Sequence, residues 1–482
     1  MNLKASRREF LRTAAVASGT LIAADPRPAV GATIPSRRPN VLMICSDQFR
    51  ADFVGANGQN PSVKTPNLDA LAARGTNFDH CVCNQPLCSP SRASFLSGMY
   101  ANRTGVFKLG LEPDHSIPSV ATLLKPAGYS THFIGKWHVS GPQTPGAKEP
   151  LGWIAPGPSR WGFDTWEGAN VLEIASHPTQ GNYWDDAGNN IGFKDRYRVD
   201  FLTDRAVWFI EQPHSEPWLL FLSQLEPHQQ NDVDDMVPPE RYAGKYDNAF
   251  VPQDLRDLPG NWNSRLKGYY GCVQAVDDCV GRIVDALQKT DQLDDTLIVF
   301  FSDHGCTFRT RLGEYKRSPH DAAIRVPLIL AGPGFDHAST VNEIVSLVDL
   351  APTLLDACAV EGPRSMQGKT LRALPTDPKA REAWDSTAYI QISASMVGRA
   401  VRTRDWVFCA YNPEGDPNRD PVSTEYLDFC MYQTGADPYQ KVNLVGRPEY
   451  AGEAAMLRAK LKELIRGNGE PDPNMKVQKY YV

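Results

Sequence analysis

The feature that most constrains this chain is an unbroken apolar run, Asn40 to Ser46, with the sequence Asn-Val-Leu-Met-Ile-Cys-Ser. A strand with one face in water alternates apolar and polar residues, so a continuous run of this length fits a strand that is buried on both faces. Such strands are typical of parallel sheets with helices packed on both sides. The run therefore predicts an α/β fold. The polar pair Asp47-Gln48 directly follows this first predicted strand.

Strand-like and helix-like segments then alternate along the chain. Further strands are predicted at Trp218 to Leu222, Leu297 to Phe301 and Arg325 to Leu330, and helices from Thr65-Pro66 to Gly75, from Tyr269 to Leu287 and from Leu347 to Cys358. Thr65 is expected to cap its helix and Pro66 to occupy the first turn. The alternation predicts a large, mainly parallel sheet sandwiched by helices, with ligands bound beyond the carboxyl ends of the strands.

The C-terminal part has a different pattern. After Gly362 a connector rich in proline and arginine continues to about residue 380. Short strand-like runs follow at 388–392, 399–402 and 406–410, and a final helix is predicted at 453–465. We expect an α/β catalytic domain over residues 33–375 and a smaller α+β subdomain over residues 376–482.

The N-terminus has the pattern of an export signal. Arg7-Arg8 precede a weakly apolar stretch from Thr13 to Ala23, which is about half the ~20 residues that a membrane-spanning helix needs. Small residues at Val30 and Ala32 offer a cleavage site. We expect a twin-arginine signal peptide over residues 1–32, recognition by the twin-arginine export machinery, and a periplasmic or secreted mature protein without a membrane span.

Composition excludes other classes of protein. A formal net charge of -6 over 482 residues gives no basic field for nucleic-acid binding, so no nucleic-acid partner is expected. Ten cysteines are too few for a disulfide scaffold. Cys272 and Cys279 lie on one predicted helix, about 10.5 Å apart in rise, which exceeds the ~7 Å limit for a disulfide.

Polar residues follow several of the predicted strands. Asp47, Gln48, Asp303 and His304 supply mostly oxygen ligands and one imidazole. Oxygen ligands suit a hard cation such as Ca²⁺, while the imidazole leaves Mg²⁺ or Mn²⁺ open. A divalent cation is therefore expected beyond the carboxyl ends of the strands.

The segment from Cys88 to Gly98, Cys-Ser-Pro-Ser-Arg-Ala-Ser-Phe-Leu-Ser-Gly, predicts a reactive sulfur. Pro90 can open a helix, which places Cys88 at the electropositive helix N-terminus. A thiol in that position and beside Arg92 is expected to have a lowered pKa and to act as a nucleophile.

This segment resembles the signature of the type I sulfatases of the alkaline-phosphatase superfamily, Cys-x-Pro-x-Arg followed by Ser/Thr-Gly. Further segments match that family in its order along the chain: Ser46-Asp47-Gln48, Gly135-Lys136-Trp137-His138, Pro227-His228, Ser302-Asp303-His304-Gly305, Lys316 and Arg325-Val326-Pro327. The resemblance implies an alkaline-phosphatase-like fold and hydrolysis of a sulfate ester.

The resemblance also implies the nucleophile and the metal site. Cys88 would be oxidised to formylglycine by a formylglycine-generating or sulfatase-maturating enzyme, and the hydrated aldehyde would attack sulfur. Arg92 would stabilise the nucleophile. The metal ligands would be Asp47, Gln48, the modified Cys88, Asp303 and His304.

Four further residues receive roles by the same resemblance. Lys136 and Lys316 would bind the sulfate group, and they would stabilise the charge that spreads over it in the transition state. His138 would take a proton from the hydrate so that the sulfated intermediate collapses, and His228 would protonate the leaving oxygen.

Two positions depart from the family pattern. The residues after Lys316, Arg317-Ser318-Pro319-His320-Asp321, lack the common Tyr-Glu, which leaves the roles of His320 and Asp321 open. Gln48 replaces a second aspartate, which removes one negative charge from the metal site.

Loop residues near these motifs predict the substrate. A polar pocket with an aromatic platform is expected from His177, Trp184, Asp185, Asp186, Gln229, Gln230, Arg309 and Arg311. Such a pocket suits a sulfated carbohydrate or polysaccharide, and Arg309 and Arg311 could bind a carboxylate or second sulfate. Two alternatives stay open: a phosphonate monoester or phosphodiester hydrolase of the same superfamily, and an inactive sulfated-glycan-binding protein in which Cys88 stays a thiol.

Overall fold

The computed structural model describes residues 38–142 and 148–479, all within one compact unit. The predicted signal peptide, residues 1–32, lies outside the described residues.

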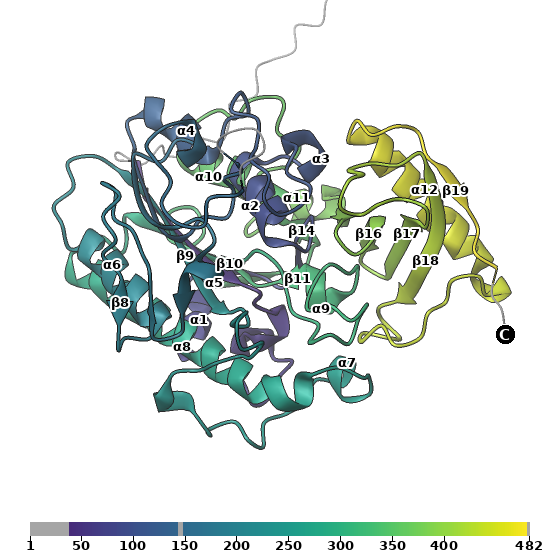
Figure 1. Ribbon diagram of the computed structural model, residues 1–482. Helices are drawn as coiled ribbons and strands as arrows, with labels where there is room; N and C mark the ends of the chain where they lie inside the picture. The colour runs from purple at the N-terminus through teal and green to yellow at the C-terminus, as the bar shows by residue number, and fades with distance from the viewer. Residues whose placement is uncertain (1–37, 143–147, 480–482) are drawn as a thin grey trace, which may run out of the picture. The chain divides into compact units, whose positions relative to one another are not determined.

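A large eight-stranded sheet forms the centre of this unit (Figure 1). Its strand order is β13 (Ser339–Val341), β2 (Thr76–Phe78), β12 (Leu328–Ala331), β10 (Thr296–Ser302), β1 (Asn40–Asp47), β9 (Trp218–Pro227), β4 (Ser130–Lys136) and β5 (Thr165–Ala169). The strands from β10 to β5 are parallel to one another, whereas β12 runs antiparallel to β10. The predicted large, mainly parallel sheet is confirmed, with an antiparallel strand towards one edge.

Each face of the sheet is covered by helices, which explains the unbroken apolar run of β1. Leu42 and Ile44 pack into one core cluster with α1 (Pro66–Arg74), α6 (Arg198–Ile210) and α8 (Trp262–Lys289). Val41 and Met43 pack into a second cluster with α2 (Cys88–Ser97), α4 (Val120–Leu124) and α10 (Leu350–Ala357). Side chains alternate between the faces of a strand, so both sets of residues must be apolar.

The prediction of one strand from Arg325 to Leu330 is wrong. Arg325–Val326 (β11) pairs with Cys81–Val82 (β3) in a separate small sheet, which β14 (Val345–Ser346) completes. Pro327 has no N–H to donate, and the chain leaves the small sheet there before β12 begins at Leu328 in the large sheet.

The predicted cap of α1 is also wrong. The Thr65 hydroxyl accepts from the Gly55 N–H and donates to the Asp69 side chain, and among the described residues it accepts from no backbone N–H of α1. The first N–H groups of α1 donate instead to Asp277 on α8. Pro66 does occupy the first turn, and Gly75 follows the last residue, as predicted.

The C-terminal part forms a second sheet of five strands: β15 (Thr387–Ile392), β16 (Val397–Thr403), β17 (Trp406–Asn412), β18 (Glu425–Gln433) and β19 (Asn474–Lys476). Helix α12 (Ala451–Gly467) packs on one face through Leu457, Leu461 and Ile465. The predicted α+β subdomain is confirmed, although β18 and β19 were not expected. Its boundary at residue 376 stays a prediction.

Short elements connect these layers. They are the sheet of β6 (Ser176–His177), β7 (Gln180–Gly181) and β8 (Phe193–Lys194), and the helices α3 (Ala101–Thr104), α5 (Leu172–Ala175), α7 (Gln253–Arg256), α9 (Asp321–Ile324) and α11 (Pro378–Ala383).

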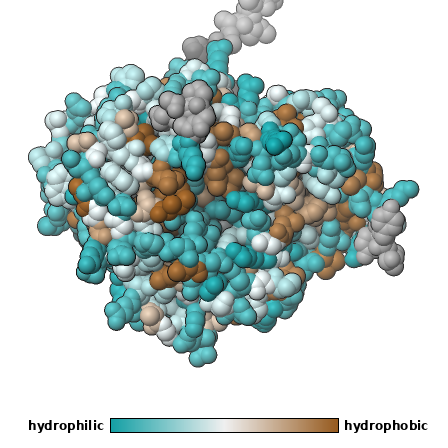
Figure 2. Space-filling model, viewed as in Figure 1, coloured by the Kyte–Doolittle hydropathy of each residue, from teal (hydrophilic) through white to brown (hydrophobic). Residues whose placement is uncertain are grey.

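All ten cysteines are buried and free, Cys272 and Cys279 included. Within the described ranges, no helix combines the length and the apolar character that crossing a bilayer requires. The face shown in Figure 2 is mostly hydrophilic, with hydrophobic side chains in separate small groups.

Candidate active site

The predicted site residues meet beyond the carboxyl ends of the parallel strands. Asp47 ends β1, Lys136 ends β4, His228 directly follows β9, and Asp303 directly follows β10. Helix α2 begins at Cys88 and points its N-terminus into the same region. The side chains of this centre are almost fully buried.

Cys88 lies among cations and candidate metal ligands. Its Sγ is 3.0 Å from Lys316 Nζ, 3.7 Å from Lys136 Nζ and 3.3 Å from His304 Nε2. Burial alone would raise the pKa of the thiol, but Lys136, Lys316 and His304 outweigh burial and hold that pKa well below its ordinary value. The sulfur therefore occupies a position that favours a negatively charged nucleophile.

Four side chains could hold one metal ion. The ligand atoms of Asp47, Cys88, Asp303 and His304 all lie within 4.8 Å of one another. The Nδ1–H of His304 donates to the Gly305 carbonyl at 3.0 Å, which turns Nε2 towards Cys88 Sγ and Asp47 Oδ1.

Gln48 supports the same interpretation. Its Oε1 is buried and makes no hydrogen bond within the described residues, while its Nε2 donates to Gln229 Oε1 at 2.8 Å. Its backbone is in the left-handed region, with φ at 68°, which is strained for a residue that carries a side chain. An unpaired buried oxygen on a residue whose backbone N–H contacts Asp303 Oδ1 at 3.3 Å fits a further ligand of a divalent cation.

Arg92 holds the two carboxylates in place. Its fully buried guanidinium donates to Asp303 Oδ2 at 3.1 Å, to Asp47 Oδ2 at 3.3 Å and to the Lys136 carbonyl at 2.9 Å. No direct contact joins it to Cys88 among the hydrogen bonds of the described residues. The hydrogen bonds of Arg92 thus go to the two carboxylates rather than to the sulfur.

Two lysines from different parts of the chain lie next to Cys88: Lys136 at the end of β4, and Lys316 in the loop between β10 and α9. Lys136 Nζ contacts Asp47 Oδ2 at 2.7 Å, and Lys316 Nζ contacts the Nε2 atoms of both His228 and His304 at 3.2 Å. Burial by itself would raise the pKa of Asp47, but Lys136, His228 and Lys316 lower it below the ordinary value. Both ammonium groups can therefore reach an anion bound next to Cys88.

His138 lies beside a carboxylate that the sequence did not indicate. Glu173 Oε1, on α5, lies 3.3 Å from His138 Nδ1 and 2.8 Å from Lys136 Nζ. Burial would raise the pKa of Glu173, but Lys136 and His138 lower it to about 2. No motif marks this residue, since it lies far along the chain from Lys136.

His228 presents one ring nitrogen to the centre. Its Nδ1–H donates to the Gln229 carbonyl at 2.6 Å, which turns Nε2 towards Lys316. The backbone contact therefore sets the tautomer and the direction of the ring.

Several of the loop residues predicted to line the substrate pocket are bonded to different parts of the described chain. Gln230 is buried and bonded to Arg198 and Ser176, and Asp186 is bonded to Arg160, so both have internal structural roles. Gln229 accepts a hydrogen bond from Gln48 and so contacts the catalytic centre.

Other members of that group lie apart. His177 pairs with Asp232, and Arg309 pairs with Asp234 at 3.2 Å. The two open positions after Lys316 are also structural: His320 contacts the Tyr432 hydroxyl, and Asp321 pairs with Arg402.

Comparison with known proteins identifies the family. The model of the sulfatase family matches residues 39–360, and that of the N-sulphoglucosamine sulphohydrolase C-terminal domain matches residues 313–467. This chain belongs to the sulfatase family. It is a sulfuric ester hydrolase, and the predicted membership and enzyme class are confirmed.

The alignments with relatives and with solved structures cover most of this sulfatase. An ulvan-active sulfatase of Formosa agariphila is 28% identical over 465 residues, which cover 92% of this chain and 84% of the relative. A solved structure in complex with its substrate D-glucosamine-2-N,6-O-disulfate has a TM-score of 0.73 at 24% identity and covers 91% of this chain and 99% of that one. A phosphonate monoester hydrolase of Agrobacterium radiobacter has a TM-score of 0.68 at 21% identity and covers 89% of this chain and 96% of that one.

Proposed function

We propose that this sulfatase hydrolyses a sulfate ester on a carbohydrate or polysaccharide and releases inorganic sulfate, with a formylglycine made from Cys88 as the nucleophile and a divalent cation beside it. The observation that carries this proposal is the position of Cys88 Sγ, at hydrogen-bond distance from Lys316 and within 4.8 Å of three candidate metal ligands. Negative charge at the nucleophile and on a bound sulfate is compensated there on several sides.

The modified residue and the cation supply chemistry that the unmodified side chains lack. When present, the hydrated aldehyde supplies an oxygen nucleophile at the position of the Cys88 sulfur. When bound by Asp47, Gln48, residue 88, Asp303 and His304, the cation polarises that nucleophile and neutralises charge on sulfate oxygens. The mostly oxygen donor set suits Ca²⁺, and the imidazole of His304 also permits Mg²⁺ or Mn²⁺.

The surrounding side chains bind and orient the sulfate group. Lys136 at the end of β4 and Lys316 in the loop after β10 both reach the nucleophile and donate to sulfate oxygens, so they stabilise the charge that spreads over these oxygens in the transition state. Arg92 keeps Asp47 and Asp303 in the ligand position by its fork of hydrogen bonds.

Two histidines supply the proton transfers. His138, next to Glu173, takes the proton from the second hydroxyl of the hydrate so that sulfate leaves. His228, with both ring nitrogens protonated, gives its Nε2 proton to the leaving alcohol oxygen and keeps the Nδ1–H that is bonded to the Gln229 carbonyl.

A carbohydrate substrate agrees with several features of the chain. The relatives include an ulvan-active sulfatase, and a similar solved structure holds a sulfated glucosamine. The mostly hydrophilic surface in Figure 2 suits a polar, hydrated substrate. A twin-arginine signal over residues 1–32 would deliver the folded enzyme to the periplasm or the medium, where polysaccharides are found, after a maturation enzyme has converted Cys88 in the cytoplasm.

A phosphonate monoester or phosphodiester hydrolase is the second candidate. The similarity to a solved phosphonate monoester hydrolase favours it, although at 21% identity that similarity concerns the fold. An inactive glycan-binding protein would require Cys88 to stay a thiol.

One experiment tests these candidates together. The protein is expressed with a formylglycine-generating enzyme, and the peptide across Asn84 to Arg92 is analysed by mass spectrometry. We expect a peptide mass about 18 Da below that of the thiol form, because the thiol is converted to the aldehyde whose hydrate is the nucleophile. The same preparation is assayed on 4-nitrophenyl sulfate, a phosphonate monoester and a phosphodiester, with Cys88→Ala as the control.

The proposal predicts the aldehyde, faster turnover of the sulfate ester than of either phosphorus ester, and no turnover by the folded Cys88→Ala variant. Preference for a phosphorus ester would establish the second candidate. An unmodified thiol without any turnover would support a binding protein.

A further inference from the structure

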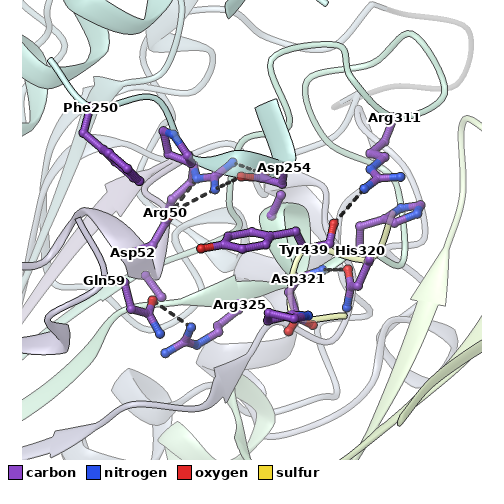
Figure 3. Close-up of a pocket in the computed structure, with 15 residues that line it drawn as sticks. Arg50, Asp52, Gln59, Phe250, Asp254, Arg311, His320, Asp321, Arg325 and Tyr439 are labelled. Atoms are coloured by element: carbon purple, nitrogen blue, oxygen red, sulfur yellow. Dashed lines mark hydrogen bonds and ion pairs between the residues drawn. The ribbon is translucent and has the colours of Figure 1, made fainter. Parts of the chain in front are cut away.

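A pocket of about 160 Å³ lies where three parts of the chain meet (Figure 3). Arg50 and Asp52 follow β1, Arg311 and His320 belong to the loop after β10, and Tyr439 belongs to the loop between β18 and α12. One liquid water takes about 30 Å³, so the pocket can hold a group considerably larger than a single water.

The pocket adjoins the catalytic centre. Arg50 is two residues after Gln48, so their Cα atoms are at most about 7 Å apart. Arg311 and Lys316 share a loop that is pinned by a bond from the Thr307 N–H to the Tyr315 carbonyl at 2.7 Å. Two segments thus supply residues to both sites, as a substrate that occupies both would require.

Within the part of the chain that the structure describes, the charges that line the pocket are paired with opposite charges, with one exception. Arg50 pairs with Asp52 and Asp254, and Arg325 pairs with Asp79. Asp321 pairs with Arg402, which is not part of the lining.

Arg311 is the exception. Among the described residues no carboxylate pairs with it, and its one hydrogen bond is to the Tyr439 carbonyl at 2.9 Å. A guanidinium has five N–H donors, so most of them stay available. Burial, together with the nearby Arg311 charge, holds the pKa of His320 well below its ordinary value, so Arg311 supplies the positive charge in this part of the pocket.

Tyr439 adds an aromatic surface. In Figure 3 its ring lies across the middle of the lining residues, and its hydroxyl is on the side of Arg50. Within the described residues this hydroxyl makes no hydrogen bond, and the ring is only partly buried. An aromatic face and a few unpaired polar groups are typical of a ligand pocket.

We infer that this pocket binds an anionic group, a carboxylate or a sulfate, on a sugar next to the one that bears the scissile sulfate. The inference rests on the proposed function and narrows it: the preferred substrate is a saccharide of at least two units with a second negative charge. Arg311 binds that charge, and Tyr439 packs against its sugar ring.

The test compares two arginines of the same loop. Arg311→Gln removes the unpaired charge, and Arg309→Gln removes a charge that Asp234 already compensates. Both variants and the wild type, converted at Cys88, are assayed on 4-nitrophenyl sulfate and on oligosaccharides from ulvan, carrageenan and glycosaminoglycans. For the best oligosaccharide, matched forms with reduced uronic carboxyls or with the neighbouring sulfate removed are assayed as well.

We expect Arg311→Gln to lower kcat/KM on the best oligosaccharide about 10-fold, mainly through KM, as loss of one charge-assisted hydrogen bond implies. Turnover of 4-nitrophenyl sulfate should be unchanged, and Arg309→Gln should match the wild type on both substrates. On the oligosaccharide that lacks the second anion, Arg311→Gln and the wild type should have the same kcat/KM. If this is the carboxyl-reduced form, the anion is a carboxylate; if it is the desulfated form, the anion is a sulfate.

Other outcomes overturn the inference. They are an equal defect on the aryl ester, an unchanged rate on the oligosaccharide, or a defect that persists without the second anion. Turnover of the aryl ester but of no oligosaccharide also overturns it and leaves sulfatase chemistry intact. Absence of all turnover by protein that carries the aldehyde would contradict the proposed function instead.

Discussion

At the scale of single residues, His228 shows how one backbone contact can prepare a side chain for chemistry. The Gln229 carbonyl accepts the Nδ1–H, so the other ring nitrogen faces Lys316 and the space next to Cys88. A ring without this contact could turn either nitrogen inward. Its position at the end of β9 therefore suits a proton donor to the leaving oxygen.

This role predicts a dependence on the leaving group. His228→Ala should lower kcat/KM on an alkyl or sugar sulfate by about 10²–10⁴-fold, the usual range for loss of a general acid. On 4-nitrophenyl sulfate the loss should be much smaller, because nitrophenolate leaves without protonation. Steady-state kinetics on both esters measure the difference.

The matched control is His228→Asn, whose amide can still donate to the Gln229 carbonyl. It should show the same pattern if the proton matters, and near wild-type rates if only the contact matters. An equal loss on both esters by His228→Ala would contradict the role of general acid.

At the scale of elements, the short helix α5 positions the end of β4. Glu173 on α5 contacts Lys136, the last residue of β4, and His138 two residues later. His138 has a φ of 58°, a left-handed conformation that a residue with a side chain seldom adopts. Glu173 is thus a positioning residue, since it acts through the two side chains that reach the nucleophile.

We predict that Glu173→Gln lowers kcat on 4-nitrophenyl sulfate about 10- to 100-fold with little change in KM. The reason is that the carboxylate that orients His138 is lost, while the groups that bind the sulfate remain. Lys136 keeps its contact with Asp47, so the sulfate is still bound. The matched control is Glu149→Gln, because Glu149 lies farther from His138, at 3.9 Å. A similar loss in Glu149→Gln, or a loss explained by a lower unfolding midpoint, would contradict the positioning role.

The elements also show what the sequence could predict. The continuous apolar run of β1 and the amphipathic stripe of α8 follow directly from burial on a two-sided sheet, and both were found. The motif residues at strand ends were likewise correct in position, because parallel strands bring their carboxyl ends together.

The errors have identifiable physical causes. Pro327 divides the predicted strand Arg325 to Leu330 between two sheets, and periodicity alone does not reveal such a change of partner. Strand β18 begins with alternating residues next to a polar loop, and β19 is only three residues long. Glu173 carries no local signal, since its role depends on a contact between elements that are distant in sequence.

At the scale of the whole molecule, the fold partly or fully buries histidines outside the catalytic centre. Burial, with a smaller effect of His214, lowers the pKa of His132 to about 4. Burial also lowers the pKa of His214 and of His320. His132 packs against Phe209 and contacts the Thr165 hydroxyl through Nδ1, so its neutral form fits the folded state.

These shifts predict that acid destabilises the folded protein. An unfolded histidine has a pKa of about 6.5, so between pH 6.5 and pH 4 the unfolded chain binds more protons at His132 than the folded chain. The stability that neutral His132 contributes is thus complete above about pH 6.5 and is lost as the pH falls towards 4. For this one residue the loss should reach about 2–3 kcal/mol.

Chemical denaturation of wild type and His132→Phe at several pH values measures this loss. The free energy of unfolding should fall more steeply with acid in the wild type than in the variant. His177→Phe, at an exposed position, should keep the wild-type slope, whereas parallel curves for wild type and His132→Phe would show that His132 does not carry this acid sensitivity.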